Sequence, residues 1–138
     1  MARSDSFALA NSTFEEAEFV IIGVPYDGTT RLRSGTRKAP NAIRKASRIF
    51  DPYLFEHDLD MSSVMVHDAG DLDCGSSCED MFEAVEREAS KVVKAGKFPI
   101  IMGGERSITY PFVKAYRKVG VISIDAHLDF HVQGDRKF

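Results

Sequence analysis

Four short apolar runs, separated by helix-like segments, constrain the fold of this chain most strongly. The runs cover residues 18–24, 64–66, 98–102 and 121–124, and most of their side chains are aliphatic or aromatic. A short apolar run bounded by Gly, Pro or Asp is typical of a buried strand, and helical spacing between such runs indicates crossover helices. The alternation predicts an α/β fold with a parallel sheet and helices on both faces.

Three helices are expected between these runs. The first covers residues 40–50, with Pro40 at its first position. The second follows Ser76 and Glu79, which have the spacing of a capping box, and Gly96 ends it. The third covers residues 108–118. The loop at 26–39, between the first run and the first helix, is long enough to have a function.

Composition narrows the class of protein. The 138 residues have a net charge of −3 and form no basic stripe, so no nucleic-acid partner is expected. No apolar run approaches the roughly 20 residues that span a bilayer, so no membrane is expected either. With only two cysteines, the chain cannot be a disulfide scaffold. We expect one cytoplasmic domain over residues 1–138.

Polar side chains follow the apolar runs, and the cluster after residue 124 is the most informative. Asp125, His127 and Asp129 alternate, so in an extended chain they face the same side. Two carboxylates and an imidazole suit a divalent ion such as Mn²⁺. The pattern is short, however, and an Asp at a strand end often only caps a turn. From the residues alone, a metal site and a turn cap are both open.

Several segments together resemble a known family. They read GVPYDGTT at 23–30, GTR at 35–37, PNAIR at 40–44, GGERS at 103–107 and DAHLD at 125–129. In this order and spacing they resemble the N-terminal half of the agmatinase branch of the arginase, or ureohydrolase, family. The resemblance implies a three-layer α/β/α arginase-like fold and a dinuclear Mn²⁺ centre. It also implies hydrolysis of a small cationic guanidino substrate, agmatine being favoured, to an amine and urea, as in polyamine biosynthesis.

The resemblance further assigns roles to the last motif. Asp125 would bridge both ions, His127 would bind one and Asp129 the other. A carboxylate-rich rim at the strand ends agrees with a cationic substrate. Family members commonly form trimers or hexamers, so a homo-oligomer is expected. No catalytic residue beyond the metal ligands is assigned.

Two departures from the family pattern change these expectations. Arg106 stands where the family has a ligand histidine, and a guanidinium has no lone pair to donate to a metal. The third family motif, an Asp-x-Asp pair, is absent, so we expect a truncated domain with at most partial Mn²⁺ occupancy and impaired activity. In the family sheet, moreover, the run at 121–124 does not lie beside the run at 98–102, so it would lack a neighbour.

Two alternatives remain open at this point. The chain could be a non-catalytic family relative that acts through oligomer assembly, or Asp125, His127 and Asp129 could form a site for a single ion. Elsewhere, Asp68 and Asp71 are expected to cap turns. The basic residues of the 26–39 loop are expected to form a solvated face. The alternative is that they border a substrate entrance or a subunit contact.

Overall fold

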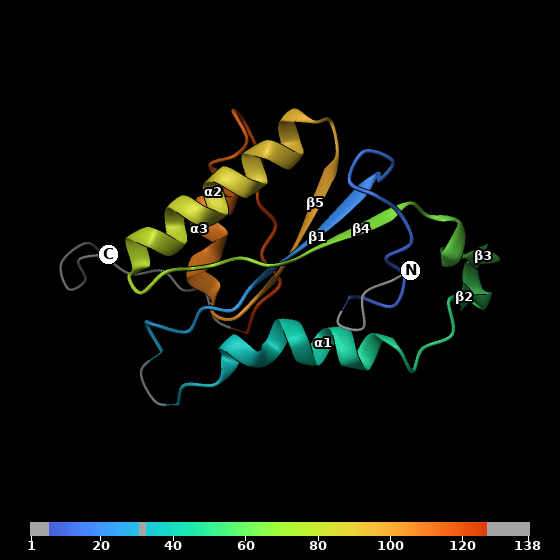
Figure 1. Ribbon diagram of the computed structural model, residues 1–138, viewed down its shortest axis with the longest axis horizontal. Helices are drawn as coiled ribbons and strands as arrows, with labels where there is room; N and C mark the ends of the chain where they lie inside the picture. The colour runs from blue at the N-terminus through green and yellow to red at the C-terminus, as the bar shows by residue number, and fades with distance from the viewer. Residues whose placement is uncertain (1–5, 31–32, 127–138) are drawn as a thin grey trace.

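A parallel three-stranded sheet forms the centre of the computed structural model, which describes residues 6–30 and 33–126. The strands are β1 (Phe19–Val24), β4 (Val66–Asp71) and β5 (Phe98–Gly103), in the order β4-β1-β5. β1 lies in the middle and pairs in parallel with both neighbours (Figure 1). Its near-continuous apolar sequence is the pattern expected of a central parallel strand buried on both faces.

Helices cover both faces of this sheet, as the sequence predicts. α2 (Cys78–Lys94) and α3 (Thr109–Val113) lie on one side, and α1 (Ala39–Ser47) lies on the other (Figure 1). Alternate residues of β1 enter different clusters: Val20, Ile22 and Val24 pack with the apolar face of α2, whereas Ile21 packs with residues of β4 and β5. The period-two alternation of the strand therefore divides the core into two layers.

The capping box of α2 lies one residue later than predicted. The hydroxyl of Ser77 accepts a hydrogen bond from the Asp80 backbone N–H at 3.0 Å, and the Asp80 carboxylate accepts from the Ser77 N–H at 3.1 Å. In this register the helix buries Met81 and Val85 against β1. Ser77 and Asp80, not the equally spaced Ser76 and Glu79, therefore form the capping box.

The predicted fourth strand at 121–124 is wrong for the described structure. These residues adopt no regular secondary structure, and Val121, Ile122 and Ile124 are 62%, 92% and 99% exposed. A strand needs a neighbour for its backbone groups, and no described segment pairs with this run. The preceding helix is also shorter than predicted, since α3 ends at Val113.

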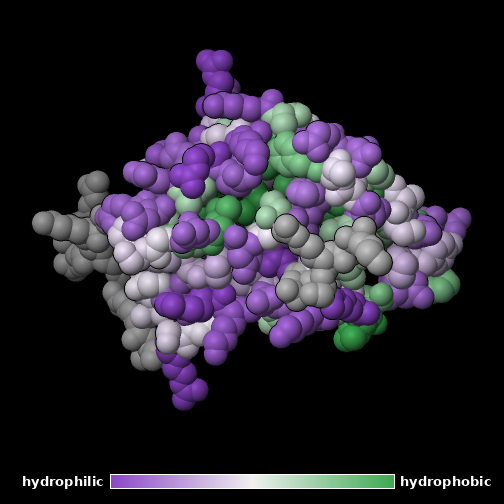
Figure 2. Space-filling model, viewed as in Figure 1, coloured by the Kyte–Doolittle hydropathy of each residue, from purple (hydrophilic) through white to green (hydrophobic). Residues whose placement is uncertain are grey.

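The excursion between α1 and β4 contains a small antiparallel pair, β2 (Tyr53–Leu54) with β3 (Leu59–Asp60), which the sequence analysis did not predict. Single 3-10 turns occur at Thr36–Lys38, Phe55–His57, Met61–Ser63 and Arg106–Ile108. Within residues 6–30 and 33–126, none of the helices has the length and apolar character required to cross a bilayer. Hydrophilic side chains dominate the face shown in Figure 2, and hydrophobic ones show mainly in its middle and upper part.

Candidate functional site at the strand ends

The carboxyl ends of β1 and β5 are joined by backbone hydrogen bonds. Gly104 N–H donates to the Val24 carbonyl at 3.3 Å, and Glu105 N–H donates to the Tyr26 carbonyl at 3.0 Å. A methyl group at Gly104 would overlap the Tyr26 carbonyl oxygen, so this approach of two backbones requires glycine. The polar segments that follow the two strands are therefore held side by side, at the edge where parallel sheets bind ligands.

Glu105 fixes the beginning of the 26–39 loop. Its carboxylate accepts hydrogen bonds from the Thr29 N–H at 2.9 Å and from the Thr29 hydroxyl at 2.6 Å. The Ser107 hydroxyl donates to the same carboxylate. Glu105 is thus engaged within its own loop and the facing one, and it acts here as a positioning residue.

Asp27 holds the rest of this loop. Its side chain is buried, and it accepts hydrogen bonds from the Gly35 N–H at 2.6 Å, the Arg37 N–H at 3.3 Å and the Arg37 guanidinium. The hydrogen bond from the Arg37 side chain, followed by that from Gly35, lowers the pKa of Asp27 to about 2. Arg37 therefore belongs to a loop anchor, although 58% of its side chain remains exposed.

Asp68 and Asp71, which were expected to cap turns, instead bind Arg44. The Arg44 guanidinium donates to both Asp68 carboxylate oxygens, at 2.7 and 2.8 Å, and to Asp71. Asp68 also accepts from the Phe7 N–H and, in the turn-capping manner expected, from the Gly70 N–H. The cluster ties α1 and the N-terminal segment to the end of β4. The interpretation as turn caps is therefore correct only for the single Gly70 contact.

Burial and the hydrogen bonds to Asp68 have opposite effects on its pKa. Burial alone would raise the pKa of Asp68, but the hydrogen bonds from Arg44, Phe7 and Gly70 outweigh it and lower the pKa. The hydrogen bond to Asp68 raises the pKa of Arg44 still further above its usual range. Gly23 leaves the necessary space, because a side chain there would overlap Asp71 and crowd the guanidinium. Arg44 lies four residues after Pro40 on α1, and both are buried, but no pattern in the sequence indicates the pairing of Arg44 with Asp68 and Asp71.

Of the predicted metal ligands, the structure describes Asp125, whereas His127 and Asp129 lie outside the described residues. The Asp125 carboxylate forms an ion pair with the Arg106 guanidinium. Among the described residues there is no group of three His, Cys, Asp or Glu side chains able to hold a metal. The convergence of Asp125, His127 and Asp129 on one ion therefore stays a prediction.

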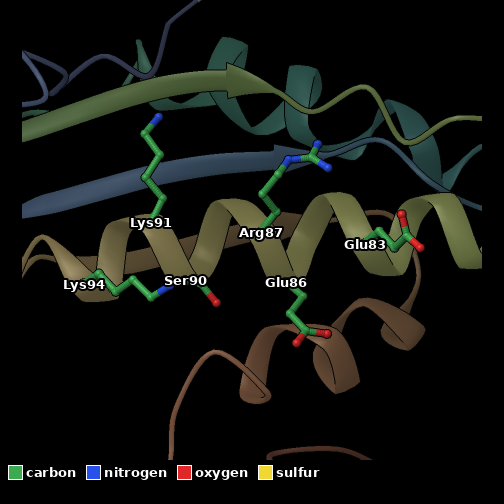
Figure 3. Close-up of a pocket in the computed structure, with 6 residues that line it drawn as sticks. All are labelled: Glu83, Glu86, Arg87, Ser90, Lys91 and Lys94. Atoms are coloured by element: carbon green, nitrogen blue, oxygen red, sulfur yellow. The ribbon is translucent and has the colours of Figure 1, made fainter.

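A surface hollow of about 730 Å³ lies away from the strand ends, along the outer side of α2. All of its lining residues come from this one helix, and Figure 3 shows Arg87 and Lys91 extending to one side and Glu86 to the other. Lys91 pairs with Glu88, and Glu86 pairs with Lys114 of the segment after α3. The hollow is a charged helix surface whose side chains do not converge on a common point.

Comparisons with known proteins agree with this arrangement. The model of the arginase family matches residues 17–137. An agmatinase of Pyrococcus horikoshii is 34% identical over 138 residues, which cover 97% of this chain and 49% of the relative. An N(1)-aminopropylagmatine ureohydrolase of Thermococcus kodakarensis is 35% identical, over 83% of this chain and 41% of the relative.

Solved structures extend the likeness to the fold. The agmatine ureohydrolase of Thermoplasma volcanium superposes with a TM-score of 0.79 at 34% identity, over 84% of this chain and 40% of that one. A Trypanosoma cruzi formiminoglutamase with Mn²⁺ gives a TM-score of 0.74 at 34% identity, over 88% and 43%. The chain spans less than half of the length of these relatives. Its sequence motifs, its sheet and these matches together show that the chain belongs to the arginase family.

Proposed function

We propose that the protein is a metal-dependent ureohydrolase, which adds water to a guanidino compound and releases an amine and urea. The observation that carries this proposal is the family match through residue 137, which includes the motifs at the carboxyl ends of β1 and β5. Relatives named agmatinase and N(1)-aminopropylagmatine ureohydrolase favour agmatine or a substituted agmatine as substrate. Such a reaction would serve polyamine biosynthesis.

The donor set at 125–129 suits a divalent metal, with Mn²⁺ as the proposed ion. Asp125, His127 and Asp129 would hold it, and they offer the oxygen and nitrogen donors that Mn²⁺ accepts. A bound ion of this kind supplies Lewis acidity and lowers the pKa of water. The solved formiminoglutamase relative is described with Mn²⁺, which supports the choice of ion. Arg106 does not fit this set, because its guanidinium is a fixed cation without a lone pair.

The described residues would shape the space next to these donors. Glu105 fixes Thr29, and Asp27 fixes residues 35–37, so the 26–39 loop is held at both ends beside the strand ends. Thr29 and residues 35–37 would thus be held in place before a substrate binds, which reduces the entropy lost on binding. We propose that this loop borders the substrate entrance.

A urea assay of the complete protein tests the proposed function. With saturating Mn²⁺, we expect urea from agmatine, and the Asp125→Asn variant should release at least tenfold less. The matched control is Asp73→Asn, since Asp73 lies after β4 and its carboxylate accepts a hydrogen bond from the nearby Gly75 N–H. If neither agmatine, arginine nor guanidinobutyrate yields urea, the proposal is refuted.

A second candidate is a non-catalytic relative that acts through assembly, and the Arg106–Asp125 ion pair favours it. In that case the protein would join a homo-oligomer, a trimer or hexamer by family resemblance, without turning over substrate. Arg106→His distinguishes the two candidates, because it restores the ligand histidine of the family motif. Urea release by this variant, with light scattering to measure the mass of the assembly, would exclude the non-catalytic role.

A further inference from the structure

We infer that Arg106 is a built-in counter-ion of Asp125, and that a divalent metal ion must displace its guanidinium to reach that carboxylate. The inference rests on the metal site of the proposed function but concerns a different property, namely competition between a side chain and an ion. It assigns a role to the residue in which this chain departs from the family motif.

The local structure delivers the guanidinium to Asp125. Arg106 begins the 3-10 turn that follows β5, directly after the Gly104 and Glu105 backbone contacts with the β1 loop. Its Nη1 donates to Asp125 Oδ2. The Asp125 side chain is only 21% exposed, whereas that of Arg106 is 59% exposed. The Asp125 carboxylate is thus the less exposed partner of a pair that lies at the surface.

The adjacent Glu105 carboxylate has partners of its own. It accepts hydrogen bonds from Thr29 and Ser107, which fix the loop. The Arg106 guanidinium reaches the Asp125 carboxylate instead, in a charge-assisted hydrogen bond.

Apolar packing contributes little to the position of Asp125. The preceding Val121, Ile122 and Ile124 are largely exposed, so these side chains do not anchor the segment in the core. The ion pair with Arg106 ties Asp125 to the carboxyl end of β5. Arg106 consequently neutralises the carboxylate beside the end of β5.

Electrostatics then opposes a metal at the same carboxylate. A divalent ion bound to Asp125 would lie within a few ångströms of the guanidinium, and like charges at this distance repel strongly when they are partly sheltered from water. Ion binding must break the pair or accept the repulsion. Removing the positive charge should therefore increase the affinity for Mn²⁺, even when no new ligand is added.

Titration of the full chain with Mn²⁺ tests this inference, with the electron paramagnetic resonance signal of free Mn²⁺ as the readout. Arg106→Gln removes the charge without adding a metal ligand of comparable strength, and we expect it to tighten Mn²⁺ binding at least tenfold at low salt. Arg106→Lys keeps the charge and should stay within threefold of the unmodified chain. Arg87→Gln removes a charge from the exposed side of α2 and controls for net charge.

The background variant Asp125→Asn shows whether Arg106 acts through this carboxylate. In that background, Arg106→Gln should change Mn²⁺ affinity less than threefold. Three results would each overturn the inference. The first is that Arg106→Gln binds Mn²⁺ no more tightly than the unmodified chain, and the second is that Arg87→Gln gains as much affinity as Arg106→Gln. The third is that Arg106→Gln gains as much Mn²⁺ affinity in the Asp125→Asn background as in the unmodified chain. Because Arg106 is largely exposed, these variants should keep the thermal midpoint of the chain, which circular dichroism checks.

The outcome is separable from that of the proposed function. If the protein releases urea but Arg106→Gln does not bind Mn²⁺ more tightly, the proposed ureohydrolase function is supported and the counter-ion role of Arg106 is refuted. If Arg106→Gln binds Mn²⁺ more tightly but no guanidino compound yields urea, the counter-ion role is supported and the ureohydrolase function is refuted.

Discussion

Replacing Arg44 by Met tests how this fold accommodates buried charge. Arg44 and Asp68 have side chains only 4% and 1% exposed, and Asp71 is 34% exposed. Met replaces the apolar stem of the arginine but not its guanidinium, so both carboxylates lose their cation. Breaking a buried pair by removing one partner costs about 3–5 kcal/mol. Asp68 keeps the Phe7 and Gly70 N–H donors and Asp71 reaches water, so we expect the low end, about 3 kcal/mol of unfolding free energy.

The pH dependence of the loss identifies its cause. In the unmodified chain the pKa of Asp68 is lowered, so its stabilising contribution is present above the ordinary pKa near 4 and is lost as pH falls through the lower folded value. Without Arg44, burial acts to raise the pKa of Asp68 and is opposed only by the Phe7 and Gly70 N–H donors, so the variant should gain less stability than the unmodified chain as pH rises past about 4. The difference between the two chains should therefore widen from pH 3 to pH 7.

Urea denaturation of both chains at several pH values measures this difference. A loss of about 3 kcal/mol corresponds to roughly 10 °C in the thermal midpoint of a domain of this size. Arg44→Lys keeps the charge but not the forked geometry and should lose less. Arg87→Met, on the exposed face of α2, should stay within about 0.5 kcal/mol. A loss below about 1 kcal/mol at pH 7, or an equal loss at pH 3 and pH 7, would refute the reasoning.

Three further changes have defined outcomes. Asp27→Asn removes a group whose pKa is lowered to about 2, so it should destabilise the chain above pH 4, with the difference closing toward pH 2, as followed by thermal melts. Gly104→Ala forces a methyl group against the Tyr26 carbonyl oxygen and should lower the thermal midpoint, whereas Gly120→Ala, which meets no atom within 4 Å, should not. Met81→Ala opens a cavity at a fully buried side chain and should cost about 2–5 kcal/mol in chemical denaturation.

β1 and β5 could be predicted because each carries an apolar run. The run that became β1 is apolar on both faces, which is the signature of the central strand. β5 lies at the sheet edge, where Phe98 and Ile100 are exposed. The run predicted at 64–66 overlaps β4 only at Val66, because β4 continues through polar residues to Asp71. α2 was predictable from its apolar period, and only its cap was misplaced, by one residue. Local sequence determines these elements because they bury side chains spaced along a single segment.

The predictions that were wrong concern the strand at 121–124 and the role of Asp68 and Asp71. Both features depend on partners that lie far away in the sequence. Residues 121–124 have the composition of a strand, but a strand forms only when a neighbouring edge accepts its backbone hydrogen bonds. Arg44 lies on a helix, and its partners Asp68 and Asp71 follow some 25 residues later on another element. A pattern read within one segment contains no information on such pairs.

The long-range pairs also change how charge at the strand ends should be understood. From the sequence, the acidic side chains there are expected to form a negative rim that suits a cationic substrate. In the described structure, aspartates at these ends are instead paired with arginines, in the sets Asp27 with Arg37, Asp68 and Asp71 with Arg44, and Asp125 with Arg106. A paired carboxylate produces a much weaker field at a distance than an isolated one. The guanidino substrate proposed above would therefore have to be recognised by contacts within the site and not by long-range attraction to the rim.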